Sequence, residues 1–173
     1  MTSALVIIDV QEGMFQQSTP PHDGAAVVER ISGLLARARR ERVPVYFVQH
    51  DSGPGDMLER GTAGWRIHAP IAPRPAETIV EKRHPSAFHD TEFDAILRRD
   101  GIDRLVVCGM QTEFCVDSTC RAAYALGYKL TLVSDAHTTF DTPVLPAAQI
   151  RAHHNFTLGG DFATCKPAAE VAF

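Results

Sequence analysis

Residues 105–119 read LVVCGMQTEFCVDST, a stretch that joins an apolar run to a glycine turn and the start of a helix. The run at 105–108 predicts a buried strand, Gly109 opens the turn, and a helix is expected over about 115–126. Gly127 stands where helices commonly end in a left-handed residue. A strand that passes through a short turn into a helix is typical of α/β proteins with a parallel sheet.

The same alternation continues on both sides of this stretch. Further strands are predicted at 4–8, 45–48, 78–80 and 130–133, with an edge strand at 162–164, and helices at 25–40, 91–100 and 142–154. Thr91 is expected to cap the second of these helices, and Thr142 with Pro143 to open the third. Because the strands are apolar throughout, both faces of the sheet should be covered. The sequence therefore predicts one α/β domain over residues 1–173, with three α/β/α layers and a Rossmann-like, mainly parallel sheet.

One segment, residues 51–75, does not fit the alternation. It is rich in glycine and proline and too long for an ordinary connection. It is expected to be either a loop that flanks a functional site or a mobile surface loop, and the sequence leaves both open.

Composition narrows the class of protein. The net charge is −4, from 17 basic and 21 acidic residues, and 45% of the residues are hydrophobic. Neither sign of charge forms a long run, so we expect no nucleic-acid partner and no membrane surface. The first apolar run has no basic segment before it, which favours a cytoplasmic protein. The four cysteines form no CxxC pair, so they are expected to be reduced thiols rather than a disulfide framework or a redox pair.

Three reactive side chains, Asp9, Lys82 and Cys115, follow predicted strands. In open parallel sheets, ligands bind beyond the carboxyl ends of the strands. Each residue alone has a plainer interpretation, as a turn cap, a solvated lysine or a core thiol. Their convergence on one edge of the sheet favours a catalytic group.

Three segments carry a family resemblance: IIDVQ at 7–11, EKRHPSAFHDT at 81–91 and GMQTEFCVDST at 109–119. They resemble, in order and spacing, the signature segments of the isochorismatase-like cysteine hydrolases. The resemblance implies a six-stranded parallel sheet, a triad on Asp9, Lys82 and Cys115, and a homo-oligomer acting on a small molecule. It further implies cleavage of an amide, ureide or carbamoyl C–N bond through a thioester, with release of ammonia. Nicotinamidase-type and isochorismatase-type hydrolysis are the alternatives, but true isochorismatases lack the cysteine.

Physical chemistry agrees with this assignment. A helix N-terminus and the Lys82 ammonium would both favour the thiolate of Cys115, and Asp9 could accept its proton. Backbone N–H groups of the turn could hold the developing oxyanion. By the resemblance these belong to Gln111 and Cys115, and the bond between Met110 and Gln111 is expected to be a cis peptide.

The substrate pocket is harder to predict. Gln11, Phe15, Trp65 and Phe88 abut the predicted edge and are candidates for substrate binding. For Trp65 and Phe88 a place in the hydrophobic core is an equally good interpretation.

No metal and no cofactor are expected. Nicotinamidases of the family place an Asp-x-His pair after the second strand, where this chain has the tetrapeptide QHDS at 49–52. The histidines are therefore interpreted as surface or pocket-edge residues. A non-catalytic nucleotide-binding module is the competing class, but neither GxGxxG after the first strand nor a Walker A motif occurs.

Overall fold

The structure is a computed structural model that describes residues 2–173. Its centre is one sheet of six strands, all parallel, in the order β3-β2-β1-β4-β5-β6. The strands are β1 (Ser3–Ile8), β2 (Val45–His50), β3 (Thr78–Lys82), β4 (Arg104–Met110), β5 (Lys129–Thr138) and β6 (Thr164–Lys166). The predicted fold class is confirmed, and the sheet is entirely rather than mainly parallel.

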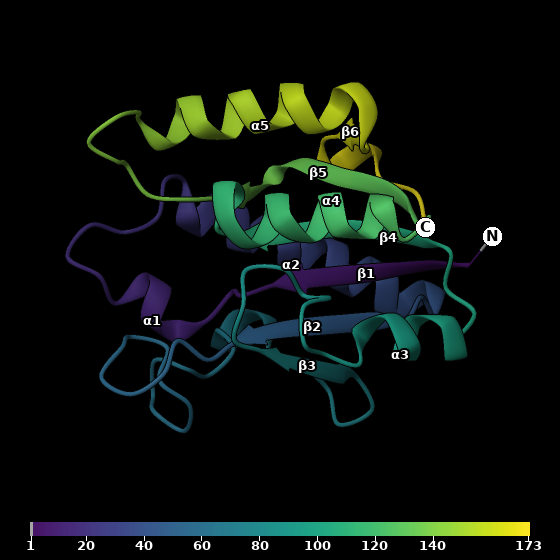
Figure 1. Cartoon of the computed structure of the whole chain (residues 1–173), viewed down its shortest axis with the longest axis horizontal. Helices are drawn as coiled ribbons and strands as arrows, with labels where there is room; N and C mark the ends of the chain where they lie inside the picture. The colour runs from purple at the N-terminus through teal and green to yellow at the C-terminus, as the bar shows by residue number, and fades with distance from the viewer. Residues whose placement is uncertain (1) are drawn as a thin grey trace.

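Helices cover both faces of the sheet. The α-helices are α1 (Glu12–Phe15), α2 (Gly24–Glu41), α3 (Phe93–Arg99), α4 (Asp117–Ala125) and α5 (Ala147–Asp161). Short turns of other helix types are η1 (Ala69–Ile71), the π-helical η2 (Thr112–Val116) and η3 (Ala168–Glu170). Figure 1 shows α2 behind the sheet and α3 and α4 in front of it. Within residues 2–173, no helix has the length and apolar composition needed to cross a bilayer.

The central strand β1 shows why its sequence is apolar throughout. Leu5 and Ile7 pack into the cluster beneath α2, whereas Val6 and Ile8 pack into the cluster on the opposite face. Successive side chains of a strand point to opposite faces, so a strand buried on both sides needs apolar residues at every position. The sheet therefore carries two hydrophobic cores, one on each face.

Gly109 sets how closely β4 approaches β1. Its φ of +120° is readily adopted only by glycine, and a Cβ atom there would lie 2.1 Å from the carbonyl oxygen of Ile8. Ile8 and Gly109 are partners in the β1–β4 register. The absence of a side chain lets the carboxyl ends of the two central strands meet.

The last helix corrects the sequence prediction. It begins at Ala147 rather than at Thr142, and it continues to Asp161 rather than ending near residue 154. The Thr142 hydroxyl instead accepts N–H bonds from Val144 and Leu145 and forms a turn. A second proline, Pro146, is the residue that precedes the helix. A hydroxyl residue before a proline is a common helix start, but here it serves a turn.

Smaller differences concern element ends. Strand β5 extends five residues beyond the predicted 133, and the edge strand lies at 164–166 rather than 162–164. Helix α3 begins at Phe93, and the Thr91 hydroxyl accepts the N–H of Phe93 from just outside the helix.

The long segment 51–75 is joined to α1 by backbone contacts. The N–H of Gly13 donates to the carbonyl of Gly64, and a Cβ on Gly64 would lie 2.2 Å from the Met57 carbonyl oxygen. Leu58 is 2% exposed. The segment therefore lies tightly against α1, at the carboxyl end of β1, and flanks the site described next.

Candidate active site

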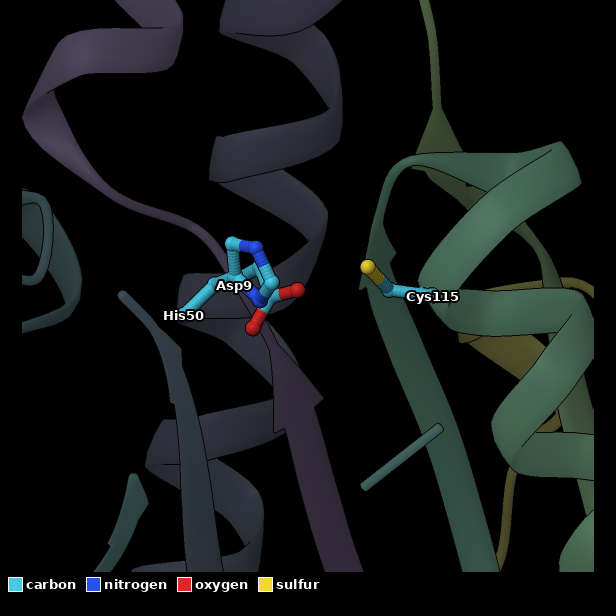
Figure 2. Close-up of side chains that lie close together, drawn as sticks. All are labelled: Asp9, His50 and Cys115. Atoms are coloured by element: carbon cyan, nitrogen blue, oxygen red, sulfur yellow. The ribbon is translucent and has the colours of Figure 1, made fainter. Parts of the chain in front are cut away.

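The three predicted residues come from three elements that end at the same edge of the sheet. Asp9 directly follows β1, Lys82 is the last residue of β3, and Cys115 lies in η2 after β4. Figure 2 shows the Cys115 sulfur directed from the start of its helix toward Asp9 and His50. Parallel strands bring their carboxyl ends together, which explains how residues 106 positions apart in sequence meet.

Lys82 is the centre of the cluster. Its Nζ lies 2.7 Å from Asp9 Oδ2, in an ion pair whose two side chains are both 0% exposed. The same Nζ donates a hydrogen bond to Cys115 Sγ at 3.3 Å and contacts His50 Nδ1 at 3.0 Å. The structure thus brings Asp9, Lys82 and Cys115 into mutual contact, as the sequence predicts.

Burial adds an effect on the Cys115 thiol that the sequence expectation did not include. Burial is the largest cause that raises the pKa of its thiol, and together with the Asp9 carboxylate, against the opposing effect of the Lys82 ammonium, it brings the pKa to about 12. Burial therefore favours the neutral thiol of Cys115. Desolvation outweighs the ammonium here, and Cys115 sits in a π-helical turn ahead of α4 rather than in the first turn of an α-helix.

Asp9 is arranged as an acceptor for that proton. Its φ of +49° lies in the left-handed region, which is uncommon outside glycine and occurs at functional sites. Within residues 2–173 no backbone N–H or hydroxyl donates to its buried carboxylate. The groups that face the carboxylate are the Lys82 ammonium and the Cys115 thiol, so the carboxylate is free to take the thiol proton.

The turn before the nucleophile contains a cis peptide bond between Met110 and Gln111, at the position expected from the sequence. The Gln111 carbonyl accepts N–H bonds from Phe114 at 3.2 Å and from Val116 at 3.1 Å. The oxyanion role assigned to the amides of Gln111 and Cys115 stays a prediction.

His50 is the residue that the sequence did not single out. It ends β2 and is the register partner of Lys82 in β3. Burial lowers the pKa of its imidazole, and the neighbouring Lys82 ammonium lowers it further. Its place at the carboxyl end of a strand was the available signal.

Gln11 is fully buried, and its side chain binds backbone atoms. Its Oε1 accepts the N–H of His50 at 2.8 Å, and its Nε2 donates to the carbonyls of His50 at 3.0 Å and Trp65 at 2.8 Å. Both amide donors are thus used within the chain. The geometry gives Gln11 a role in fixing the end of β2, whereas the predicted contact with substrate stays a prediction.

The three aromatic candidates lie in different surroundings. Phe15 is partly buried and stacks on His68 with ring centroids 4.1 Å apart. Trp65 is partly buried in the segment 51–75, below the Arg60 guanidinium. Phe88 packs on Phe93 in the core cluster in front of the sheet. The structure therefore favours the core interpretation for Phe88, and the substrate roles of Phe15 and Trp65 stay predictions.

Two groups of side chains among residues 2–173 carry metal-ligand atoms within 4.8 Å of one another. In the group of Asp9, His50 and Cys115, the Lys82 ammonium already contacts all three, so a positive charge stands where an ion would bind. The second group is His84, His89 and Asp90, on the surface.

The second group does not fit an ion as it stands. The rings of His84 and His89 are stacked, with centroids 4.0 Å apart and planes 16° apart. A metal ion lies near the plane of each imidazole that binds it, and two nearly parallel planes at this separation share no such point. Neither group is therefore arranged as a metal site in this conformation.

Comparison with known proteins agrees with the geometry. A family model described as the isochorismatase domain matches residues 3–158. Streptothricin hydrolase of Streptomyces noursei is 36% identical over 177 aligned residues, which cover 98% of this chain and 64% of that protein. The chain thus spans less than two thirds of that relative.

Solved structures give the same picture. A cysteine hydrolase from Pseudomonas syringae pv. phaseolicola superposes with a TM-score of 0.90 at 26% identity, covering 97% of this chain and 89% of that one. N-carbamoylsarcosine amidase from Thermoplasma acidophilum superposes with a TM-score of 0.86 at 25% identity over 100% of both chains.

The parallel sheet and the Asp–Lys–Cys grouping at its carboxyl edge define a cysteine hydrolase. With the match of the family model over most of its length, the chain belongs to the isochorismatase family.

Proposed function

We propose that this protein hydrolyses a C–N bond of a small amide, ureide or carbamoyl compound through a thioester on Cys115, with Asp9 and Lys82 as catalytic partners. The observation that carries the proposal is the fully buried Lys82–Asp9 ion pair in contact with the Cys115 sulfur. A buried charge pair is costly to maintain and is a weak source of stability. Its placement beside a thiol supports a chemical role.

The acylation step follows from these contacts. Asp9 takes the thiol proton of Cys115 as the sulfur attacks the substrate carbonyl carbon, and the carbonyl electron pair moves onto oxygen. The N–H groups of Gln111 and Cys115 donate to that oxyanion. When the oxyanion collapses, the C–N bond breaks, the leaving nitrogen takes the proton from Asp9, and ammonia or an amine departs.

Deacylation reverses the proton path. A water molecule gives a proton to Asp9 as its oxygen attacks the thioester carbon. The C–S bond breaks, the sulfur regains that proton, and a carboxylic acid or carbamic acid leaves. Throughout both steps the Lys82 ammonium offsets negative charge on Cys115 and Asp9 in a buried site.

Relatives support the bond type and leave the substrate open. N-carbamoylsarcosine amidase and streptothricin hydrolase carry names that describe hydrolysis. The isochorismatase-type alternative is disfavoured by the thiol of Cys115, which that reaction does not use. The nicotinamidase-type alternative is disfavoured because the Asp-x-His pair typical of nicotinamidases is missing after the second strand, where residues 49–52 read QHDS.

The test is a screen for ammonia release over small primary amides, ureides and carbamoyl compounds. A hit should yield an acyl adduct on the Cys115 peptide when the reaction is quenched in acid and mapped by mass spectrometry. The Cys115→Ala protein is the matched control and should show neither turnover nor adduct. Turnover by that variant at the wild-type rate would overturn the proposal.

A homo-oligomer remains our expectation for the assembled protein. Light scattering coupled to gel filtration gives the particle mass directly, to be compared with the 18.9 kDa of the chain. A mass near that of one chain would contradict the expectation.

A further inference from the structure

We propose that His50 is a positioning residue of the site: as a neutral imidazole it accepts a hydrogen bond from the Lys82 ammonium and holds that ammonium between Asp9 and Cys115. The inference rests on the proposed function and deepens it, because it adds a fourth residue to the catalytic group. The geometry also gives the site a titratable group besides the carboxylate and the thiol.

The first support is the match between donors and acceptors. An ammonium group has three N–H donors and no acceptor. Lys82 Nζ has three acceptors within reach: Asp9 Oδ2 at 2.7 Å, His50 Nδ1 at 3.0 Å and Cys115 Sγ at 3.3 Å. Three partners therefore surround the three N–H donors: His50 and Cys115 by hydrogen bonds, and Asp9 by an ion pair. The contact assigns Nδ1 as the acceptor, which places the ring proton on Nε2.

The second support is that hydrogen bonds from another side chain fix the backbone of His50. Both backbone polar groups of His50 are bound by the Gln11 side chain, whose own position is fixed by the Trp65 carbonyl. His50 and Lys82 are also register partners on adjacent strands, so their side chains leave the same edge of the sheet. Because its backbone is fixed in this way, His50 can hold the Lys82 ammonium in place.

The third support is the charge around the imidazole. The charged groups that act on it are Lys82, which faces it directly, Asp9, and Asp51 and Asp56 from the following segment. Asp9 and the Cys115 thiol each have an atom within 4.8 Å of a ring nitrogen. Asp51 does not bind His50, because its carboxylate accepts the N–H of Gly53 and forms an ion pair with Arg83. Burial and the ammonium together favour the neutral ring.

The need for such a residue arises from the reaction. When the Cys115 sulfur becomes a thioester it is a poorer acceptor, and when Asp9 takes a proton its attraction for the ammonium falls. At those moments two of the three partners of Lys82 weaken. The His50 contact is unaffected by either change and keeps the ammonium in place. Protonation of His50 would remove the acceptor and set two cations side by side.

The experiment uses three variants of the full chain. His50→Asn keeps an acceptor at nearly the place of Nδ1 and does not titrate, whereas His50→Phe keeps the ring shape without an acceptor. His153→Asn, at an exposed histidine on α5, is the matched control. Two readouts are recorded against pH: kcat/KM on a substrate found by the screen, and the rate at which iodoacetamide alkylates Cys115, which needs no substrate.

The expected result is a loss of wild-type kcat/KM on acidification with a midpoint below about 6.5, the ordinary value for histidine. In His50→Asn this midpoint moves to lower pH, while the rate near neutrality stays within about 10-fold of wild type. His50→Phe loses about 100-fold at every pH. The alkylation rate of Cys115 is also altered in His50→Phe and is restored toward wild type in His50→Asn, and His153→Asn matches wild type throughout.

An unchanged acidic midpoint in His50→Asn would overturn the inference, and so would wild-type activity in His50→Phe. If His50→Phe does not fold, the midpoint in His50→Asn decides alone. Failure of the proposed function looks different: turnover would persist in Cys115→Ala, whatever the histidine variants do.

Discussion

Cys115 and Cys120 lie five positions apart in the same helical stretch, yet their surroundings differ. Cys120 is 0% exposed and packs in the core cluster in front of the sheet, whereas Cys115 is partly exposed and contacts Lys82. Burial raises the pKa of both thiols. Acidity therefore does not separate them; what separates them is a carboxylate that can take the proton and an ammonium that can offset the charge. Reactivity here follows from the partners of the thiol.

The largest expected effect is the difference in kcat between alanine variants of Cys115 and Cys120. Cys115→Ala should lower kcat by about 10³-fold or more, because no other group can form the thioester. Cys120→Ala should leave kcat near wild type and lower the free energy of unfolding by about 1–2 kcal/mol through a small cavity. Steady-state kinetics and urea unfolding measure the two quantities. Equal loss of kcat in both variants would contradict the comparison.

Asp9→Asn should separate turnover from thiol reactivity. Removing the base should lower kcat by about 10²–10⁴-fold, and leaving the buried Lys82 ammonium unpaired should cost about 3–5 kcal/mol of stability. The Cys115 pKa should fall, because the carboxylate raises it and the ammonium lowers it.

Alkylation of Cys115 by iodoacetamide near neutral pH should therefore become faster in Asp9→Asn while hydrolysis becomes slower. Wild-type protein measured side by side is the control. Slower alkylation in the variant would show that Asp9 does not raise the thiol pKa.

A thiol-labelling series should sharpen the comparison without mutation. Partly exposed Cys115 and Cys165 should react with iodoacetamide, whereas fully buried Cys108 and Cys120 should stay unlabelled in the folded protein. Below a pKa of about 12 the thiolate fraction rises about tenfold per pH unit. The Cys115 rate should hence climb from about pH 7 to about pH 10 without a plateau. Peptide mapping reads all four sites, and equal labelling would contradict the prediction.

The smallest expected effect is that of chelation. Dialysis against EDTA should leave kcat/KM unchanged, because the Lys82 ammonium stands among the three side chains that could bind an ion at the site. Activity before and after dialysis, with zinc or iron added back to a portion, checks this. Loss on dialysis followed by recovery on adding one metal would show that an ion displaces the ammonium.

Much of this arrangement could be predicted from sequence because strand ends are visible there. Asp9 follows an apolar run directly, and Lys82 ends a shorter one, so their edge of the sheet follows from parallel topology. His50 also ends a strand, but a histidine there has many ordinary uses, and its function depends on one contact with Lys82. Pairwise contacts between strands leave no pattern along a single chain.

Two other features could not be predicted from the sequence, each for a different reason. The start of α5 was misplaced because two prolines, Pro143 and Pro146, offer competing starts, and turn hydrogen bonds of Thr142 decide between them. The upward shift of the Cys115 pKa could not be read from the sequence, because desolvation depends on the whole packed site. Local patterns give element identity and order, whereas burial and contact require the fold.

The Ile8–Gly109 contact has a consequence for how this scaffold tolerates change. The two strand ends touch backbone to backbone, with no side chain between them whose rotamer could vary. Asp9 and Cys115 follow these two strand ends. The gap between base and nucleophile is therefore set by backbone atoms within the sheet. Side chains of segment 51–75, which borders the site, can change without altering that gap, as long as the Trp65 carbonyl still accepts the hydrogen bond from Gln11. A methyl group at position 109 would do the opposite: it would leave every loop intact but force the two strand ends apart and so change that gap.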